Sequence, residues 1–372
     1  MKHIVIIGGG VAAFESAVAA RLQAPEAEVT MFSKEDILPY RRPGLSALAA
    51  GDEPVPDSFF IKSARFYGQN RINVKTGVVA ESVDPQKSTV TFSGLPDLKY
   101  DRLIIATGGN ARKIPVPGAD NANTFTLRDY NDLLTVRRML SGGGKRVAVI
   151  GGGLLGLELA DSLLKRGCQV TVIEGASSFL PRNLDFDGGR FALEKAMKND
   201  GLKIMLGKSV MEITPCGVVC SDCFVECDLV AFSTGVVPCF PTIPGIAVNR
   251  GIIVDSSMKS NIDNIYACGD VAEYNGNVCG LYITASQMGK VAGSCAAGGS
   301  AVYVPEAVPA RLNALGLKIF SAGNISGNSA SEEFRDEESY RKIFVDEAGN
   351  VTGAVFIGDI SRSTAILKQL KK

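Results

Sequence analysis

The sequence has a single histidine, no tryptophan and no excess of charge of either sign. His3 is the only histidine among 372 residues, and none of the nine cysteines precedes Cys168. Catalysis by a histidine base away from the N-terminus is therefore excluded, and so few cysteines in a chain of this length do not suggest a secreted disulfide scaffold. With 39 basic and 39 acidic residues, no global field attracts nucleic acid or an anionic membrane.

Long hydrophobic runs are absent as well. The N-terminus starts like a signal peptide, with Lys2 and an apolar run from Ile4, but glycines 8–10 interrupt that run and Glu15 lies where it should stay apolar. No stretch approaches the roughly 18 apolar residues that cross a bilayer. We expect a cytoplasmic protein that binds neither membrane nor nucleic acid. The 41 glycines and 46% hydrophobic residues are typical of an α/β fold with tight strand-to-helix turns.

One pattern of strand, glycines and helix occurs twice. Residues 4–7 are a β-branched run followed by three glycines and an apolar helix, and residues 147–150 begin the same pattern. Each copy continues into a second strand, at residues 29–32 and at residues 170–173. The chain is therefore predicted to contain two βαβ units, each with parallel strands and a right-handed crossover.

The small residues in both copies have the spacing of a dinucleotide-binding turn. The first permits a sharp turn, the second lets the backbone approach a pyrophosphate, and the third keeps the helix close to the strand. Free N–H groups and the helix dipole then favour the phosphates. The first copy has Gly8, Gly10 and Ala13, and the second has Gly151, Gly153 and Gly156. Two copies in this context predict two dinucleotide sites.

The acid that binds a ribose differs between the copies. Glu174 ends the second strand of the second copy, where an acceptor for the 2′-hydroxyl is needed. It would repel a 2′-phosphate, and no Arg or Lys occurs in residues 175–178, so this site should prefer NADH to NADPH. In the first copy that position is Ser33, and the candidate acid is Glu35, whose alternative role is that of a solvated loop residue.

Four further segments carry a resemblance to a known family. The whole chain resembles the two-dinucleotide-fold flavoproteins of the pyridine nucleotide–disulfide oxidoreductase superfamily, and within them the NADH:rubredoxin oxidoreductases and the flavin part of nitrite reductase large subunits. FAD and NADH are the cofactors that this resemblance implies. The segments are residues 38–46 (LPYRRPGLS), 100–108 (YDRLIIATG), 232–238 (FSTGVVP) and 265–273 (IYACGDVAE).

The resemblance also implies which residues hold each cofactor. Asp270 would bind the ribityl chain of FAD, although an N-cap of the next helix is its alternative role. A helix at residues 281–297 would point its N-terminus toward the flavin. The expected FAD residues are Gly8, Gly10, Ala13, Ser33, Glu35, Arg42, Ser46, Ala106, Thr107, Gly108, Gly269, Asp270 and Leu281. The expected NADH residues are Gly151, Gly153, Leu154, Leu155, Gly156, Glu174 and Gly235.

These anchors predict an α/β chain with two glutathione-reductase-like nucleotide domains and a small α+β C-terminal interface domain. In the last of these, residues 317–320, 340–345 and 351–357 are predicted as strands, followed by a helix from about Ser361. The expected boundaries are 1–109 with 236–303 for the FAD-binding domain, 110–235 for the NAD-binding domain and 304–372 for the interface domain.

The redox cysteines of the disulfide-type relatives are missing. Those relatives, and NADH oxidases and peroxidases, carry Cys in the stretch that is here residues 39–51, which has none. The resemblance then implies that reduced FAD passes its electrons directly to an external acceptor, rubredoxin or a similar carrier such as a ferredoxin. The alternatives are the flavin module of a nitrite-reducing system, a peroxide-forming NADH oxidase, and a redox-sensing flavoprotein without an efficient acceptor. Monomer and homodimer both stay open.

Glu158 has two possible roles. Related ferredoxin reductases pair a Glu on the second dinucleotide helix with a Lys that follows Leu-Ser, but here Ala47 holds the position of that lysine. Glu158 is thus either a catalytic residue, with Arg41 or Arg42 as a substitute partner, or a first-turn acid favoured by the helix dipole.

Four closely spaced cysteines, Cys216, Cys220, Cys223 and Cys227, suggest a metal site at first sight. Their neighbours favour two strands joined by a tight turn at Ser221-Asp222, whereas zinc sites need ligand pairs that converge on one point. We expect small buried apolar residues and no metal.

Overall fold

The computed structural model describes residues 2–278, 280–326 and 330–370. Its first sheet is wholly parallel, with the strand order β19–β7–β1–β2–β3. Four strands come from the first 105 residues, and the fifth comes from a segment 160 residues further on. The strands are β1 (His3–Ile7), β2 (Glu28–Phe32), β3 (Ile72–Lys75), β7 (Arg102–Ile105) and β19 (Ile265–Ala267).

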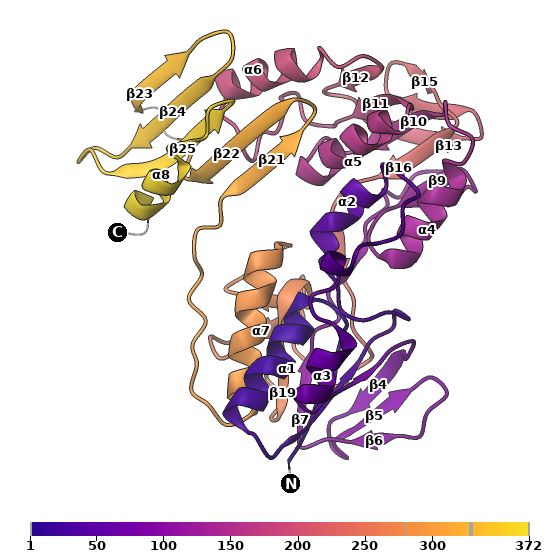
Figure 1. Cartoon of the computed structure of the whole chain (residues 1–372), viewed down its shortest axis with the longest axis vertical. Coiled ribbons are helices and arrows are strands. Elements are labelled where there is room, and N and C mark those ends of the chain that lie inside the picture. The colour runs from indigo at the N-terminus through magenta and orange to yellow at the C-terminus, as the bar shows by residue number, and fades with distance from the viewer. Residues whose placement is uncertain (1, 279, 327–329, 371–372) are drawn as a thin grey trace.

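Both faces of this sheet are covered, as its continuous β-branched strands require. Ile4, Val5 and Ile6 of the central strand have no exposed surface. Helices α1 (Val11–Gln23) and α7 (Tyr282–Ala296) lie side by side on the sheet, although almost 260 residues separate them (Figure 1). They pack very closely, since a Cβ on Gly293 would come within 2.1 Å of a carbonyl oxygen of α1.

The second sheet repeats the first, with the parallel order β12–β11–β10–β16–β9. Helices α4 (Tyr130–Met139), α5 (Leu154–Lys165) and α6 (Phe186–Ala196) belong to this fold. Both predicted βαβ units are thereby confirmed, because β1–α1–β2 and β10–α5–β11 occur as parallel crossovers. The strands are β9 (Thr124–Thr126), β10 (Arg146–Ile150), β11 (Gln169–Ile173), β12 (Leu202–Met205) and β16 (Leu229–Phe232).

Smaller sheets extend the two folds. The chain leaves the first fold through β8 (Gly109–Ala111) and returns through β17 (Val236–Pro238), and these two strands pair antiparallel. One three-stranded sheet consists of β4 (Ala80–Asp84), β5 (Thr89–Phe92) and β6 (Leu98–Lys99), and another of β13 (Val210–Thr214), β14 (Gly217–Cys220) and β15 (Phe224–Glu226). A parallel pair joins β18 (Ile252–Val254) to β20 (Ala272–Tyr274).

Short helices and helical turns fill several of the connections. The 3-10 turn η1 (Arg42–Gly44) leads into α2 (Leu45–Leu48), which packs against α5 of the second fold. The others are η2 (Asp57–Phe59), α3 (Ala64–Gln69) and η3 (Gly269–Val271).

The C-terminal part is a five-stranded antiparallel sheet in the order β21–β22–β25–β24–β23, packed by α6 and α8. Its strands β22, β24 and β25 and its helix were predicted. β22 extends three residues beyond the end of the predicted strand 317–320. β21 and β23 were not predicted, because edge strands carry polar residues such as Arg311 and Asn313. The elements are β21 (Ala310–Ala314), β22 (Leu317–Gly323), β23 (Ala330–Arg335), β24 (Tyr340–Val345), β25 (Val351–Ile357) and α8 (Ser363–Leu370).

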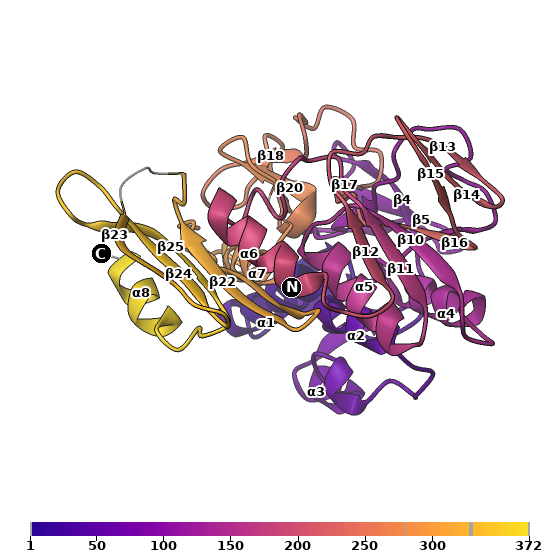
Figure 2. The ribbon, with the colours of Figure 1, turned by 90° about the horizontal axis from the view of Figure 1, so that it is seen from above.

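Seen from above, this C-terminal sheet and the β13–β15 sheet lie at opposite ends of the molecule (Figure 2). The α/β fold class with two nucleotide folds and a small C-terminal sheet is as predicted. We retain as a proposal the division into 1–109 with 236–303, 110–235 and 304–372. Among the helices of the described residues, none has the length and apolarity to span a bilayer.

Candidate dinucleotide-binding and redox site

One cavity of about 1300 Å³ lies where the carboxyl ends of the strands of both parallel sheets meet. Open parallel sheets bind ligands at this edge. A pocket for one drug-sized ligand has roughly 300–1,000 Å³, so this cavity has room for more than one such group. Its lining includes Gly10 of the first glycine turn and Gly153 of the second. The two predicted nucleotide sites therefore open into one space.

The two glycine turns have equivalent geometry. Gly8 and Gly151 adopt positive φ angles of 149° and 106°. A Cβ on Gly8 would lie 2.2 Å from the carbonyl oxygen of Ala106, and one on Gly151 would lie 2.4 Å from that of Ser233. Each turn is thus in close contact with the residue just after the neighbouring strand of its sheet, which is β7 for Gly8 and β16 for Gly151. Only glycine allows both the φ angle and this approach.

The third small residue of each motif packs beneath its turn, outside the cavity. Ala13 is completely buried, and a Cβ on Gly156 would come within 2.1 Å of the carbonyl oxygen of Gly151. By contrast, a Cβ on Gly153 would meet nothing within 4 Å, and one on Gly10 only an Arg42 nitrogen at 3.9 Å. The second glycines therefore leave space where a pyrophosphate would approach the helix N-terminus. This open cradle fits the nucleotides that the motifs predict.

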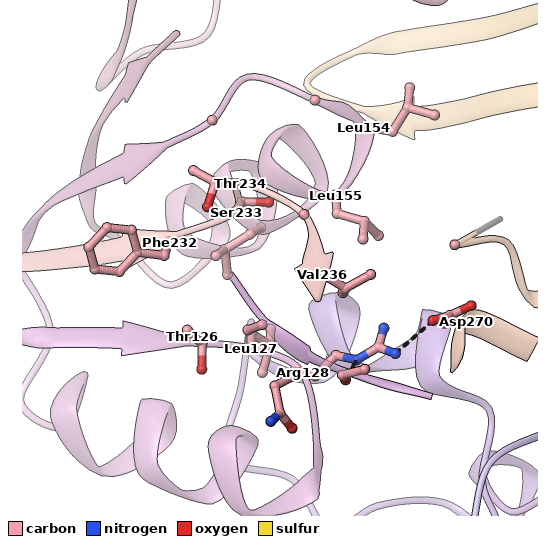
Figure 3. A pocket seen from close by; sticks show the side chains of 18 of the residues that line it. Thr126, Leu127, Arg128, Leu154, Leu155, Phe232, Ser233, Thr234, Val236 and Asp270 are labelled. Carbon is pink, nitrogen blue, oxygen red and sulfur yellow. Dashed lines mark hydrogen bonds and ion pairs between the residues drawn. The ribbon is translucent and has the colours of Figure 1, made fainter. Parts of the chain in front are cut away.

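An ion pair spans the cavity between the two folds. The Arg128 guanidinium, just after β9, donates to the Asp270 carboxylate of η3 at 2.7 Å (Figure 3). Arg128 also donates to the carbonyl of Gly109 at 3.0 Å, and its own carbonyl accepts from Arg42 at 2.8 Å. Asp270 lies within η3 and is the N-cap of neither η3 nor α7. Its alternative role as a helix N-cap is therefore not seen. Both side chains line the cavity.

Glu174 lies where the second motif requires an acid. Its carboxylate accepts from the N–H groups of Gly152 and Ala176, each at 2.7 Å, and the residue lines the cavity. These bonds fix the side chain beside the glycine turn. The remaining lone pairs of the two oxygens are available to a ribose hydroxyl.

Most of the other predicted residues also line the cavity. They are Arg42, Ser46, Ala106, Thr107, Gly108 and Gly269 on the side of the first fold, and Leu154, Leu155 and Gly235 on the side of the second. The fold brings them together from segments that are far apart in sequence.

Ser33, Glu35 and Leu281 do not line the cavity. Glu35 is only 4% exposed, and its carboxylate is bound by the Arg42 guanidinium and by the Tyr40 hydroxyl, the latter at 2.7 Å. Ser33 is 2% exposed and packs under Gly9. Neither position is a solvated loop. In this arrangement the Glu35 carboxylate holds the Tyr40–Arg42 segment, and its binding to a ribose stays a prediction.

Leu281 precedes α7 as its N-cap and is 44% exposed, whereas its neighbour Tyr282 lines the cavity. The sequence correctly placed the start of this helix. It could not tell which side chain of the first turn faces the cavity, because that depends on the packing of α7 against α1.

Glu158 lies on α5, outside the cavity lining. Burial, and to a lesser extent the nearby Asp161, raise the pKa of its carboxyl group. Among the described residues no cation lies within ion-pair distance of Glu158, and Arg42 is paired with Glu35 instead. Neither Arg41 nor Arg42, the suggested substitutes for the missing lysine, forms an ion pair with Glu158 in the described part of the chain. We propose that Glu158 acts through its neighbours and does not touch a cofactor.

One buried cysteine belongs to the cavity lining. Cys268 contributes to the lining but has no exposed surface, and its Sγ lies 3.4 Å from the Ser16 hydroxyl. Burial raises the pKa of its thiol to about 12. Among the cavity residues that the structure describes, no second cysteine stands near it.

The four-cysteine segment forms the predicted hairpin of β14 and β15, with the turn at Ser221-Asp222. As expected, Cys220 and Val218 are both buried on one face. Within the described residues, no three His, Cys, Asp or Glu side chains are grouped in a way that could hold a metal ion.

Sequence reasoning missed several basic side chains of the cavity. Six basic residues face four acidic ones in its lining, an excess that suits pyrophosphate groups. No motif marks these positions, because each comes from a loop whose place is set by the tertiary fold. Beside the predicted Arg42, they are Lys34, Lys113, Arg128, Arg182 and Lys208.

Comparison with known proteins supports the two nucleotide folds and the C-terminal sheet. Residues 2–289 match the family model described as pyridine nucleotide-disulphide oxidoreductase. Residues 309–372 match the rubredoxin NAD+ reductase C-terminal domain. The first match covers more than half of the chain.

Individual relatives match over the whole length. The NADH-rubredoxin oxidoreductase of Clostridium acetobutylicum is 36% identical over 372 residues, which cover 99% of this chain and 94% of that protein. Its crystal structure superimposes with a TM-score of 0.80 and covers all of this chain and 95% of that one. The nitrite reductase [NAD(P)H] of Bacillus subtilis is 32% identical over 100% of this chain, which spans only 47% of that protein.

Proposed function

The chain belongs to the pyridine nucleotide-disulphide oxidoreductase family, and on that premise we propose that it is an FAD-dependent NADH oxidoreductase that reduces rubredoxin. One observation carries the proposal: both glycine turns open into a single cavity. Two nucleotides held there can meet directly, without an intervening thiol pair. The NADH-rubredoxin oxidoreductase of Clostridium acetobutylicum, which matches along nearly its whole length, supports rubredoxin as the acceptor.

The cofactor supplies the redox chemistry: bound FAD can accept a hydride from NADH and release the two electrons one at a time to an iron protein. The protein supplies binding and orientation. Gly10 and the N-terminus of α1 would hold the FAD pyrophosphate, and Gly153 with the N-terminus of α5 would hold that of NADH. The chain therefore contributes position and charge, and no covalent step.

Arg128 and Asp270 would set the position of FAD relative to the second fold. Asp270 follows β19 of the first sheet, and Arg128 follows β9 of the second. Because their ion pair crosses the cavity, it holds the two sides at a fixed spacing. A hydride transfer depends on such spacing, since a small misplacement of reacting atoms slows it strongly.

Glu174 would select NADH over NADPH. Its carboxylate is fixed by two backbone N–H groups and lines the cavity next to the second turn. Lys208 also lines the cavity, but its ammonium is held by Asp222 at 2.5 Å. A 2′-phosphate would thus meet a fixed negative charge, while the Lys208 cation is already paired.

The test is an anaerobic stopped-flow measurement on the FAD-loaded protein. NADH should bleach the flavin absorbance rapidly, and mixing the reduced protein with oxidised rubredoxin should restore it with equal speed. The Glu174→Ser variant is a matched control, because it should slow the first phase and leave the second unchanged. Fast flavin reduction followed by negligible reduction of rubredoxin would contradict the proposal.

A second candidate is the flavin module of a nitrite-reducing system. The relative from Bacillus subtilis that carries this name aligns with all of this chain, and this chain spans about half of it. The same experiment separates the two functions: reoxidation by a sirohaem and iron–sulfur partner, but not by rubredoxin, would favour the second. Rapid reoxidation by O₂ alone would indicate a peroxide-forming NADH oxidase.

A further inference from the structure

The hairpin of β14 and β15 places two cysteines opposite each other. Its register pairs Val219 with Phe224, so the next pair is Cys220 with Cys223, across a turn of two residues. The N–H of Cys220 donates to the carbonyl of Cys223 at 2.8 Å. Residues that face each other as a hydrogen-bonded pair of antiparallel strands have Cα atoms about 5.5 Å apart. Disulfides span Cα distances of about 4.4–6.8 Å, so a bond between the two sulfurs needs little backbone movement.

The two thiols share one face of the hairpin but differ in exposure. Directly opposed residues of an antiparallel pair point to the same side, and Val218 on that side is buried in the core of the second fold. Cys220 is only 5% exposed, whereas Cys223 lies at the margin of this core and is partly exposed. A small reagent can therefore reach the Cys223 sulfur first, while the Cys220 sulfur is more deeply buried.

A cation stands beside this pair. The Lys208 ammonium lies 2.5 Å from the Asp222 carboxylate in the turn and interacts electrostatically with both thiols. The Asp222 carboxylate also contacts the Cys223 thiol. Burial raises the pKa of the Cys220 thiol to about 11, which favours its protonated form at neutral pH. Because Cys223 is the more exposed of the two thiols, Cys223 is the group that attacks, and Cys220 is the group that resolves.

The other two cysteines of the segment are also opposed but are arranged differently. The N–H of Cys227 donates to the carbonyl of Cys216 at 3.1 Å. The Cys216 sulfur, however, is exposed and contacts the Thr214 hydroxyl at 3.6 Å, while Cys227 is 1% exposed. Arg146 interacts electrostatically with Cys227 and is paired with two carboxylates, so the position of the exposed Cys216 sulfur is what sets this pair apart. They serve as an internal control.

We propose that Cys220 and Cys223 form a redox modification site, which hydrogen peroxide converts into a disulfide and a small dithiol converts back. In the first step the Cys223 thiolate attacks one peroxide oxygen, the O–O bond breaks, and hydroxide takes up a proton to leave as water. In the second step the Cys220 sulfur attacks the resulting sulfenic acid at Cys223, and a second water leaves. Two thiols lose two electrons and two protons to one peroxide, which balances the reaction.

The site lies on the wall of the nucleotide cavity, because Lys208 and the following Ser209 belong to the cavity lining. The N–H of Ser221 in the hairpin turn donates to the Ser209 carbonyl at 2.9 Å. The modification therefore occurs next to the segment proposed to bind NADH. It does not depend on which acceptor takes the electrons.

The test maps disulfides in the FAD-loaded full-length protein. The protein is reduced with dithiothreitol, desalted without air, exposed to hydrogen peroxide, alkylated under denaturing conditions and cleaved after Asp222. We expect the two fragments on either side of Asp222 to stay joined, with Cys220 and Cys223 unalkylated, and to separate after dithiothreitol. Cys216→Ser should leave this result unchanged, and Cys223→Ser should abolish it.

A second variant tests the order of steps. In Cys220→Ser, the sulfenic acid at Cys223 has no partner and should be captured by dimedone. The proposal is overturned if both thiols of the wild type are still alkylated after peroxide, or if the bond joins Cys216 or Cys227 instead. Because the mapping on the wild-type protein needs no variant, poor folding of a variant does not remove the test.

Discussion

Arg128 and Asp270 form an ion pair of 2.7 Å between two parallel sheets that are separate in the fold. The residues are 142 positions apart in sequence. Their side chains are 23% and 12% exposed, so the pair is largely shielded from water. It is one of the contacts between the first nucleotide fold and the second, and both of its side chains line the cavity.

Replacing Arg128 by Leu should loosen the retention of FAD. The change leaves the Asp270 carboxylate without its cation in a shielded position, which costs about 2 kcal/mol for a buried group that loses its partner. We expect a lower ratio of flavin to protein after gel filtration and a lower melting temperature. Arg128→Lys keeps the charge and should retain most of the flavin. Full flavin content in Arg128→Leu would show that the pair does not position the cofactor.

Replacing Glu174 by Ser should relax the choice of nucleotide. The variant loses the fixed negative charge beside the second glycine turn, and kcat/KM for NADH should fall about tenfold, which corresponds to roughly 1.4 kcal/mol. kcat/KM for NADPH should rise. Glu212→Gln removes an exposed acid outside the cavity and should change neither value. An unchanged NADH to NADPH ratio in Glu174→Ser would exclude Glu174 from the specificity of the site.

Alanine at the two glycines of the second turn should have opposite effects. Gly153→Ala adds a methyl group into open space at the N-terminus of α5, so the protein should fold normally but bind NADH with a much higher KM. Gly156→Ala forces a methyl group to 2.1 Å from a backbone oxygen, and overpacking of this kind costs about 1–3 kcal/mol. Thermal unfolding and steady-state kinetics on both variants check this. Equal melting temperatures for the two variants would contradict it.

The raised pKa of Glu158 predicts a pH-dependent stability difference. A carboxyl group whose pKa is higher in the folded state than its ordinary 4.5 contributes stability that is full below that value. The contribution is lost as the pH rises through the folded pKa. Glu158→Gln removes this loss, so the variant should melt at a higher temperature than the wild type at pH 8. At pH 4 the difference should largely disappear.

The same variant tests the kinetic role of Glu158. If the charge of Glu158 tunes the cofactor through its neighbours, the rate of flavin reduction by NADH should depend on pH in the wild type and not in Glu158→Gln. Glu212→Gln, which removes an exposed acid outside the cavity, is the control for loss of a charge. Identical pH profiles for the wild type and Glu158→Gln would reduce its role to one in stability.

Local pattern was enough for the parts of the molecule that are built from consecutive residues. The β-branched runs, the glycine turns at Gly8 and Gly151 and the acid at Glu174 define two βαβ units, because strand, turn and helix within about 30 residues fix their own geometry. The absence of cysteine from residues 39–51, set against the family resemblance, also limits the chemistry without reference to the tertiary structure. Even the β14–β15 hairpin followed from alternation and a two-residue turn.

Tertiary structure alone decided which side chains share the cavity. Arg128 and Lys208 come from loops without any motif, and Asp270 finds its partner only because the two sheets face each other. The partners of Glu35 were not foreseen for the same reason: a carboxylate three residues past a strand can bind a ribose or pair with an arginine, and only the fold brings Tyr40 and Arg42 to it. Ion pairs between residues far apart in the chain have no recognisable sequence pattern, whereas glycine turns have a characteristic residue spacing.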